Sequence, residues 1–246
     1  MAKKGKRFKS SVSKVELDKK YSVEDAVKLV TETANAKFDE SIDVSVRLGV
    51  DPKQSDQQVR GSIALPHGLG KEVRVLVFAK GPKENEAKEA GADFVGSDEF
   101  VEKIKGGWLD FDKVIATPDM MATVAKVAKV LGPRGLMPNP KVGTVTMNVK
   151  DAVSGEKKGK LAYRVEKAGI VHASIGRKSM GSDKLKDNFL TLMAALQKAK
   201  PASSKGVYMK STTLSATMGP GIGLDISSVQ AALKKFYFVL SYFVSL

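Results

Sequence analysis

The sequence has no cysteine and only two histidines among its 246 residues. The absence of cysteine excludes disulfide bonds, thiolate catalysis and cysteine-ligated zinc or iron–sulfur sites. His67 and His172 lie in different segments without a carboxylate at ligand spacing, so neither a metal site nor a nucleophilic site is expected. The adjacent Asp39 and Glu40 would point to opposite faces of an extended chain, so they do not form an acid–base pair. The sequence therefore predicts no enzyme activity, no metal and no cofactor.

The sequence also lacks a long hydrophobic run. Its first fourteen residues contain six basic side chains and no acidic one, and no apolar stretch follows them. This segment is therefore interpreted as a flexible basic arm and not as a secretory signal. The apolar stretch Phe236–Leu246 has about half the length that a bilayer requires. We expect no membrane span, and the absence of cysteine fits a reducing cytoplasm.

Acidic residues are scarce, above all towards the C-terminus. The formal net charge is +14, from 41 Lys and Arg against 27 Asp and Glu. Basic residues outnumber acidic ones by 13 to 10 in residues 1–67, by 15 to 13 in 68–158 and by 13 to 4 in 159–246. Clustered cations gain affinity by displacing counterions from phosphates, which favours a nucleic-acid partner over a merely soluble basic protein.

The first third of the chain has the pattern of an α+β fold. Residues 21–36 have the apolar spacing of an amphipathic helix, with Ser22 as N-cap. From Ile42 to Val50 every second residue is apolar, which predicts a half-buried strand. Gln58–Leu65 alternates in the same way and is predicted to be its antiparallel partner. Phe38, between charged residues where the chain enters the sheet, either closes the core or contacts a partner.

The middle third has a different pattern. Val73–Ala79 is almost continuously apolar, as is typical of a parallel strand buried on both faces. Short helices and strands then alternate, and Pro118 is predicted to open a helix that runs to Leu131. Its buried face would contain Met121, Val124, Ala128 and Leu131. This alternation predicts a small doubly wound α/β domain of the Rossmann-like kind.

The α+β pattern returns after Lys160. Residues 161–165 and 170–175 are predicted to form a hairpin. Ser182 is predicted to cap a helix, and Gly206–Ser215 to form a strand. One apolar stripe of that helix consists of Leu185, Phe189, Leu192 and Leu196.

We therefore predict an α+β domain, residues 1–67 and 159–228, that is split by an inserted α/β domain, residues 68–158. The chain would cross between the two domains only twice, and two adjacent crossings make a hinge. The predicted hinge residues are His67, Gly68, Gly70, Lys158 and Gly159.

Two loops are candidates for chemistry, and a third is not. His67–Lys71 is not a phosphate loop, because it precedes a strand and has Glu72 where Ser or Thr would hold magnesium. Leu131–Lys141, rich in proline and glycine, is either a structural crossover or a preformed loop that offers Arg134 and Lys141 to a phosphate backbone. The turn 217–221 either ends a strand or packs against ribose and bases.

Three stretches together closely resemble one family. They are AKFDESIDVSVRLGVDPKQSDQQVRGSIALPHGLGK, GWLDFDKVIATPDMMATVAKVAKVLGPRGLMPNPKVGTV and ATMGPG. They resemble the L-one family of bacterial large-subunit ribosomal proteins, which belong to the stalk beside the tRNA exit site. The resemblance covers residues 1–228 and implies a protein without enzymatic activity, monomeric off the ribosome, whose split domain binds a bent segment of large-subunit ribosomal RNA.

The resemblance also implies partners and site residues. The inserted domain would swing as the stalk moves and help deacylated tRNA to leave the exit site. Members also bind the leader of their own message and repress its translation. The RNA-binding residues carried over are Lys37, Phe38, Asp39, Glu40, Ser41, Thr217, Met218 and Gly219, with Arg60, His172 and Ser211 as weaker candidates. Glu40 is expected to accept hydrogen bonds from a guanine edge or a 2′-OH.

The C-terminal end departs from the family pattern. Gly223 stands where members usually have a basic residue, and members usually end soon afterwards. Residues 229–246 form an atypical hydrophobic tail, interpreted as an unnatural end from a frame change or as an extra helix that packs on the split domain. The alternative to the ribosomal function is an enzyme that uses a nucleotide in the inserted α/β domain, which only fold-level analogy suggests.

Overall fold

A computed structural model describes residues 5–16 and 18–244, with the side chains described as far as residue 236. The chain divides into two compact units, one that runs up to Gly70 and resumes at Leu161, and one that comprises Lys71–Lys160. We call them the split unit and the inserted unit. That the units are independent domains joined by a mobile hinge stays a prediction.

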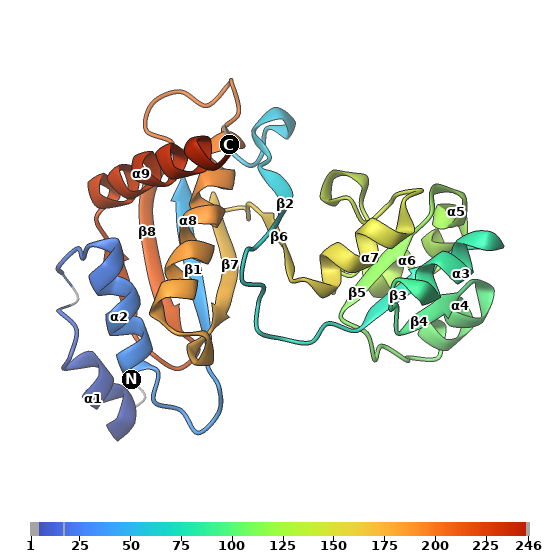
Figure 1. The fold of residues 1–246 in the computed structure, drawn as a ribbon, viewed down its shortest axis with the longest axis horizontal. Helices are drawn as coiled ribbons and strands as arrows, with labels where there is room; N and C mark the ends of the chain where they lie inside the picture. Colours follow the sequence, from blue (N-terminus) through green and yellow to red (C-terminus); the bar gives the residue numbers. More distant parts are fainter. Residues whose placement is uncertain (1–4, 17, 245–246) are drawn as a thin grey trace. The chain divides into compact units, whose positions relative to one another are not determined.

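The split unit contains a four-stranded antiparallel sheet (Figure 1). Its strands, in spatial order, are β7 (Ile170–Arg177), β1 (Ser41–Leu48), β8 (Met209–Ala216) and β9 (Gly221–Leu224). Burial alternates along β1, as the sequence pattern predicts. The strand that organises this unit is therefore central, and it pairs with two strands from the C-terminal third of the chain.

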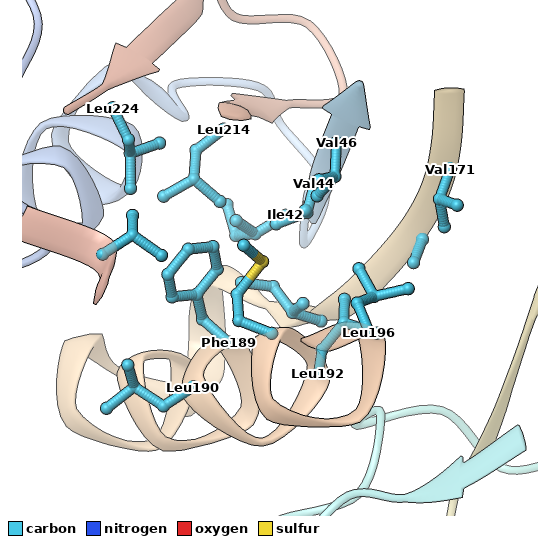
Figure 2. Close-up of a cluster of buried hydrophobic side chains, with 14 of the residues drawn as sticks. Ile42, Val44, Val46, Val171, Phe189, Leu190, Leu192, Leu196, Leu214 and Leu224 are labelled. Atoms are coloured by element: carbon cyan, nitrogen blue, oxygen red, sulfur yellow. The ribbon is translucent and has the colours of Figure 1, made fainter. Parts of the chain in front are cut away.

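Helices α2 (Val23–Thr33) and α8 (Ser182–Lys198) cover one face of this sheet (Figure 1). Phe189, Leu192 and Leu196 of α8 point towards side chains of β1, β7 and β8 (Figure 2). The predicted stripe of α8 is fully buried, and Ser22 caps α2 by accepting the backbone N–H of Asp25. Ser182, however, is the first residue of α8 and not its cap, because Gly181 occupies that position. The N-terminal arm contains a helix, α1 (Lys6–Val12), where a flexible segment was expected.

Two strand pairings differ from the predicted ones. β2 (Arg60–Ala64) pairs with β6 (Lys160–Arg164) and not with β1. The predicted hairpin of residues 161–165 and 170–175 forms only at its turn, where Val165 and Val171 make an antiparallel bridge and the N–H of Glu166 donates to the carbonyl of Ile170 at 2.9 Å. β6 and β7 belong to different sheets. Alternation shows which face of a strand is buried but not which strand lies beside it, so both errors concern partners and not elements.

The inserted unit contains a three-stranded parallel sheet in the order β4 (Phe94–Gly96), β3 (Val75–Phe78) and β5 (Lys113–Ala116). All four residues of β3 are buried, as predicted, and they alternate between two hydrophobic clusters on opposite faces of the sheet. One cluster includes residues of α4 (Asp98–Lys105), and the other includes residues of α3 (Pro82–Glu89) and α7 (Val149–Lys157).

The helix predicted over Pro118–Leu131 is broken. It consists of a 3₁₀ turn η2 (Pro118–Met120) followed by α5 (Met121–Ala125) and α6 (Ala128–Leu131). Val124 and Leu131 are buried as predicted, but Met120 and Val127 replace Met121 and Ala128 in the core. The buried residues Met120, Val124, Val127 and Leu131 still recur at helical spacing, so the prediction placed the buried face one residue too far along the chain at two of its four positions.

The C-terminal tail forms helix α9 (Ile226–Val244), which packs on the split unit. Val229 and Leu233 are buried, and Phe236 is partly buried against the same core. This agrees with the expected extra helix, whereas the frame-change origin stays a prediction. No helix within residues 5–16 and 18–244 is both long and apolar enough to cross a membrane.

Candidate nucleic-acid interface

The start of β1 and the end of β8 lie side by side in the split unit, although they are far apart in the sequence. Ile42 is paired with Ala216. Beyond that pair, the N–H of Ser41 donates to Thr217 Oγ1 at 3.1 Å, and the N–H of Thr217 donates to the carbonyl of Ser41 at 3.1 Å. Thr217 therefore extends the strand pairing by one residue with its hydroxyl as well as its backbone.

Glu40 connects these two segments from inside. Only 1% of this residue is exposed, and its carboxylate accepts two backbone N–H groups. Oε1 accepts from Ala36 at 2.6 Å, and Oε2 accepts from Met218 at 2.9 Å. The expected role, accepting hydrogen bonds from RNA, does not fit a buried carboxylate whose two oxygens already have donors. Glu40 positions the loop 36–40 against the turn 217–219.

Asp39 connects the same loop to a third segment, the 3₁₀ turn η4 (Lys178–Met180). Its carboxylate accepts the hydroxyl of Ser179 at 2.7 Å and the N–H of Ser179 at 3.1 Å. These hydrogen bonds, with Arg177 at 3.9 Å, lower the pKa of Asp39. The Lys178 ammonium donates to the carbonyl of Ala34, and the Lys178 N–H donates to the carbonyl of Glu40 at 2.9 Å. No pattern in the sequence indicated that Lys178 and Ser179 contribute to this arrangement.

The residues held in this way expose apolar side chains. Phe38 is 54% exposed and Met218 is 50% exposed. Phe38 therefore does not close the core, which was one of its two alternatives, and its contact with a partner stays a prediction. Lys37 and Thr217 are also exposed, and Gly219 lies beside them. We call Lys37, Phe38, Thr217, Met218 and Gly219 the strand-end surface.

The three weaker candidates lie elsewhere on the split unit. His172 is opposite Ser45 on β1, and Ser211 is opposite Arg47. Both therefore belong to the sheet face that α2 and α8 do not cover. His172 Nδ1 lies 3.0 Å from Ser45 Oγ, and its Nε2 lies 3.4 Å from Glu166. Arg60 is exposed on β2, outside this sheet.

The loop after α6 belongs to the inserted unit and exposes Arg134 and Lys141. Gly135 has a φ of 71°, and its N–H donates to the carbonyl of Gly132 at 3.0 Å. Asn139 accepts the N–H of Lys141 at 2.8 Å, at the start of η3 (Pro140–Val142). The loop is therefore ordered by its own hydrogen bonds and presents two cations to solvent.

The predicted hinge residues are each tied to one unit. Asn188 in α8 is fully buried, where it accepts the N–H of His67 at 3.2 Å and donates to the carbonyl of Gly68 at 2.9 Å. Lys158 and Gly159 end α7 in the inserted unit. Gly68, Gly70 and Gly159 have positive φ values of 66°, 67° and 88°. The only sequence signal for Asn188 was a polar residue within an otherwise buried helix face.

A model of the Ribosomal protein L1p/L10e family matches residues 30–220. The chain belongs to this family. It is also 72% identical over 228 residues, which are 93% of this chain and 97% of its relative, to the large ribosomal subunit protein uL1 of Bdellovibrio bacteriovorus. The matched range includes every residue of the strand-end surface.

Membership confirms the resemblance and several expectations that followed from it. The chain is a structural, non-enzymatic ribosomal protein, so the nucleotide-dependent enzyme is not supported. RNA binding, a role in translation and a place in the cytoplasmic ribosome follow from the family. Among the residues that the structure describes, no group of three or more His, Asp or Glu side chains could hold a metal ion.

Proposed function

We propose that the chain is a component of the large ribosomal subunit and binds ribosomal RNA of the stalk through the strand-end surface. The observation that carries this proposal is the position of Glu40. Its carboxylate holds the loop before β1 and the turn after β8 together, and each of these two segments exposes one apolar side chain, Phe38 and Met218. Aromatic and thioether groups fixed in this way suit stacking and close packing against unpaired bases.

The order of the surface in the free protein also supports the proposal. Four segments meet there through hydrogen bonds: the loop 34–40, the start of β1, the turn 178–180 and the turn 217–219. A surface held in this way loses little conformational entropy when RNA binds. Asp39 and Glu40 contribute by positioning backbone and side chains, while Lys37 supplies a cation. Cations supply affinity for any RNA, whereas the shape of the surface supplies preference.

We further propose that the inserted unit is a Rossmann-like domain that moves on the two connections near Gly70 and Lys160 and assists the release of deacylated tRNA from the exit site. The exposed Arg134 and Lys141 would be its contacts with RNA. The protein would bind the leader of its own operon message through the strand-end surface and repress its translation. Competition between the two RNAs for one surface is the expected mechanism.

A salt-dependent gel shift tests the RNA proposal. Three RNAs of equal length are compared: a transcript of the ribosomal stalk region, the leader of the protein's own message and a random sequence. We expect the first two to bind more tightly than the third at every salt concentration, and Phe38→Ala to weaken only these two, by about 1 to 3 kcal/mol. Exposed Val207 supplies the control variant Val207→Ala. Equal binding of all three RNAs would refute the proposal.

A further inference from the structure

A second surface of the split unit has four cations and does not belong to the strand-end surface. It is a hollow of about 690 Å³ beside the loop that follows β1 and the strands β2 and β6. Its cationic lining residues are Lys53, Arg60, Arg164 and Lys167. We call it the basic hollow. Such a volume is in the range of small-ligand sites, so the hollow can admit a phosphodiester group.

The fold brings these cations together from two distant segments. The N–H of Val165 donates to the carbonyl of Val59 at 2.9 Å. Arg60 is the neighbour of Val59 and Arg164 is the neighbour of Val165, so this hydrogen bond brings the two arginines close together. The N–H of Leu48 donates to the carbonyl of Gly169 at 2.8 Å, which places the turn after β6 at the far end of β1. The basic hollow is therefore separated from the strand-end surface by the length of β1, about 24 Å for eight residues.

Within the part of the chain that the structure describes, the four cationic side chains of the hollow have no acidic partner at ion-pair distance. All four cationic residues are exposed, and among the described residues no ion pair involves any of their side chains. The one carboxylate in the lining, Glu166, lies 3.4 Å from His172. Asp51, two residues before Lys53, accepts the backbone N–H of Lys53 at 3.1 Å. Other cations of the split unit do have acidic partners, such as Lys186 with Glu24 and Arg177 with Asp39.

Gathering like charges costs free energy that a polyanion recovers, because a cluster of unpaired cations in a concave site raises the local concentration of phosphates. We propose that the basic hollow binds the phosphate backbone of the same RNA that the strand-end surface recognises. This inference rests on the proposed function and assigns the hollow a separate task. The hollow contributes affinity that does not depend on base sequence, while the strand-end surface contributes preference.

The test compares two fourfold variants of the full chain. One removes the hollow's charges: Lys53→Gln, Arg60→Gln, Arg164→Gln and Lys167→Gln. The other removes four exposed lysines from the helical side of the same unit: Lys28→Gln, Lys184→Gln, Lys198→Gln and Lys200→Gln. Both lower the net charge by the same amount. Binding to the stalk transcript and to random RNA is measured as a function of salt, and thermal unfolding checks that both variants are folded.

We expect the slope of log affinity against log salt to become shallower by about 3 in the hollow variant and by less than about 1 in the control. The hollow variant should bind both RNAs at least tenfold more weakly while its preference for the stalk transcript stays unchanged. Equal slopes of the two variants would overturn the inference and leave the proposed function intact. A wild type without preference for the stalk transcript would overturn the proposed function itself. If the hollow variant does not fold, Arg60→Gln and Arg164→Gln alone should each reduce the slope by about 1.

Discussion

The strand-end surface and the loop after α6 are built in opposite ways. The strand-end surface joins residues 36–41 to residues 217–219 through Glu40 and Thr217, across most of the length of the chain. The loop after α6 is ordered by hydrogen bonds within residues 131–144. A single substitution can therefore dismantle the first, whereas in the second each cation acts by itself. The comparison teaches that the first surface can carry preference for one RNA and that the second offers mainly charge.

The largest effect is expected from Glu40→Gln, which keeps the shape of the side chain but removes its charge. The amide NH₂ would face a backbone N–H, so the hydrogen bond from Ala36 or the one from Met218 is lost. Leaving a buried group without its partner should lower the free energy of unfolding by about 1 to 3 kcal/mol. RNA affinity should fall by about 1 to 3 kcal/mol because the surface is no longer held in place.

Urea unfolding and gel shifts with the stalk transcript measure both effects. The exposed Glu32 on α2 supplies the matched control, Glu32→Gln. If Glu40→Gln bound the transcript as tightly as Glu32→Gln, the hydrogen bonds of Glu40 would have no part in RNA binding. The two regions would then not differ in the way that the structure indicates.

A smaller effect is expected from Thr217→Val, which replaces the hydroxyl by a methyl group of similar size. It removes the hydrogen bonds between this hydroxyl and the backbone of Ser41. Since the residue is exposed and water can replace the lost partner, the free energy of unfolding should fall by only about 0.5 to 1.5 kcal/mol. RNA affinity measured by gel shift should fall severalfold for the stalk transcript. An equal loss for random RNA would show that Thr217 has no role in preference.

The loop after α6 is tested with the double variant Arg134→Gln and Lys141→Gln. Because these two side chains would contact phosphates, the affinity for all RNAs should fall alike and the salt slope should become shallower by about 1 to 2. Thermal stability should not change, since both residues are exposed. A loss confined to the stalk transcript would contradict the contrast between the two regions, because it would give the loop a share in preference.

The smallest effect on RNA is expected from Glu156→Gln in the inserted unit. Glu156 is 2% exposed and its Oε2 lies 3.7 Å from Lys113 Nζ, too far for a hydrogen bond. Burial raises the pKa of this carboxyl above its ordinary value of 4.5. The folded protein therefore binds the proton of Glu156 more tightly than the unfolded chain does. The protonated carboxyl contributes stability below its ordinary pKa, and this contribution is lost as the pH rises through the raised pKa of the folded state.

Glu156→Gln should remove this loss of stability with rising pH, because a glutamine does not ionise. Urea unfolding of the two proteins should therefore show an advantage for the variant that grows as the pH rises from 4.5 towards neutrality, with unchanged RNA affinity. Asp151→Asn, at an exposed position of the same helix, is the control. A variant less stable than the wild type at neutral pH would show that the ion pair with Lys113 outweighs the cost of burial.

Much of the fold could be predicted from local patterns. The alternation in β1, the continuous apolar run in β3 and the stripe of α8 each identified an element and its buried face. Such patterns are visible because burial on one face repeats with the period of the backbone. Partners are not visible in this way. The pairing of β2 with β6 joins two segments that are distant in the sequence, and the period of either segment does not reveal it.

The same distinction holds for the candidate interface. The residues of the strand-end surface were found by resemblance to a family, and the structure shows how differently they act. Phe38 and Met218 point outward, while the carboxylate of Glu40 points inward and Asp39 binds Ser179. No local pattern separates a carboxylate that meets RNA from one that holds two loops. The role of such a carboxylate depends on whether it is buried and on which groups donate hydrogen bonds to it. Residues distant in the sequence provide both the burial and the donors.

By itself, the sequence determined the family, the type of each main element and the excess of positive charge that indicates a polyanionic partner. The tertiary structure alone decided that the carboxylate of Glu40 holds two segments together and that Phe38 is exposed. It also decided that Lys53, Arg60, Arg164 and Lys167 line one hollow. The physical reason is the distance along the sequence over which each effect acts. Propensity and periodicity act within one helical turn or one strand. A hydrogen bond to a buried carboxylate, or a cluster of like charges, instead requires segments that only folding brings together.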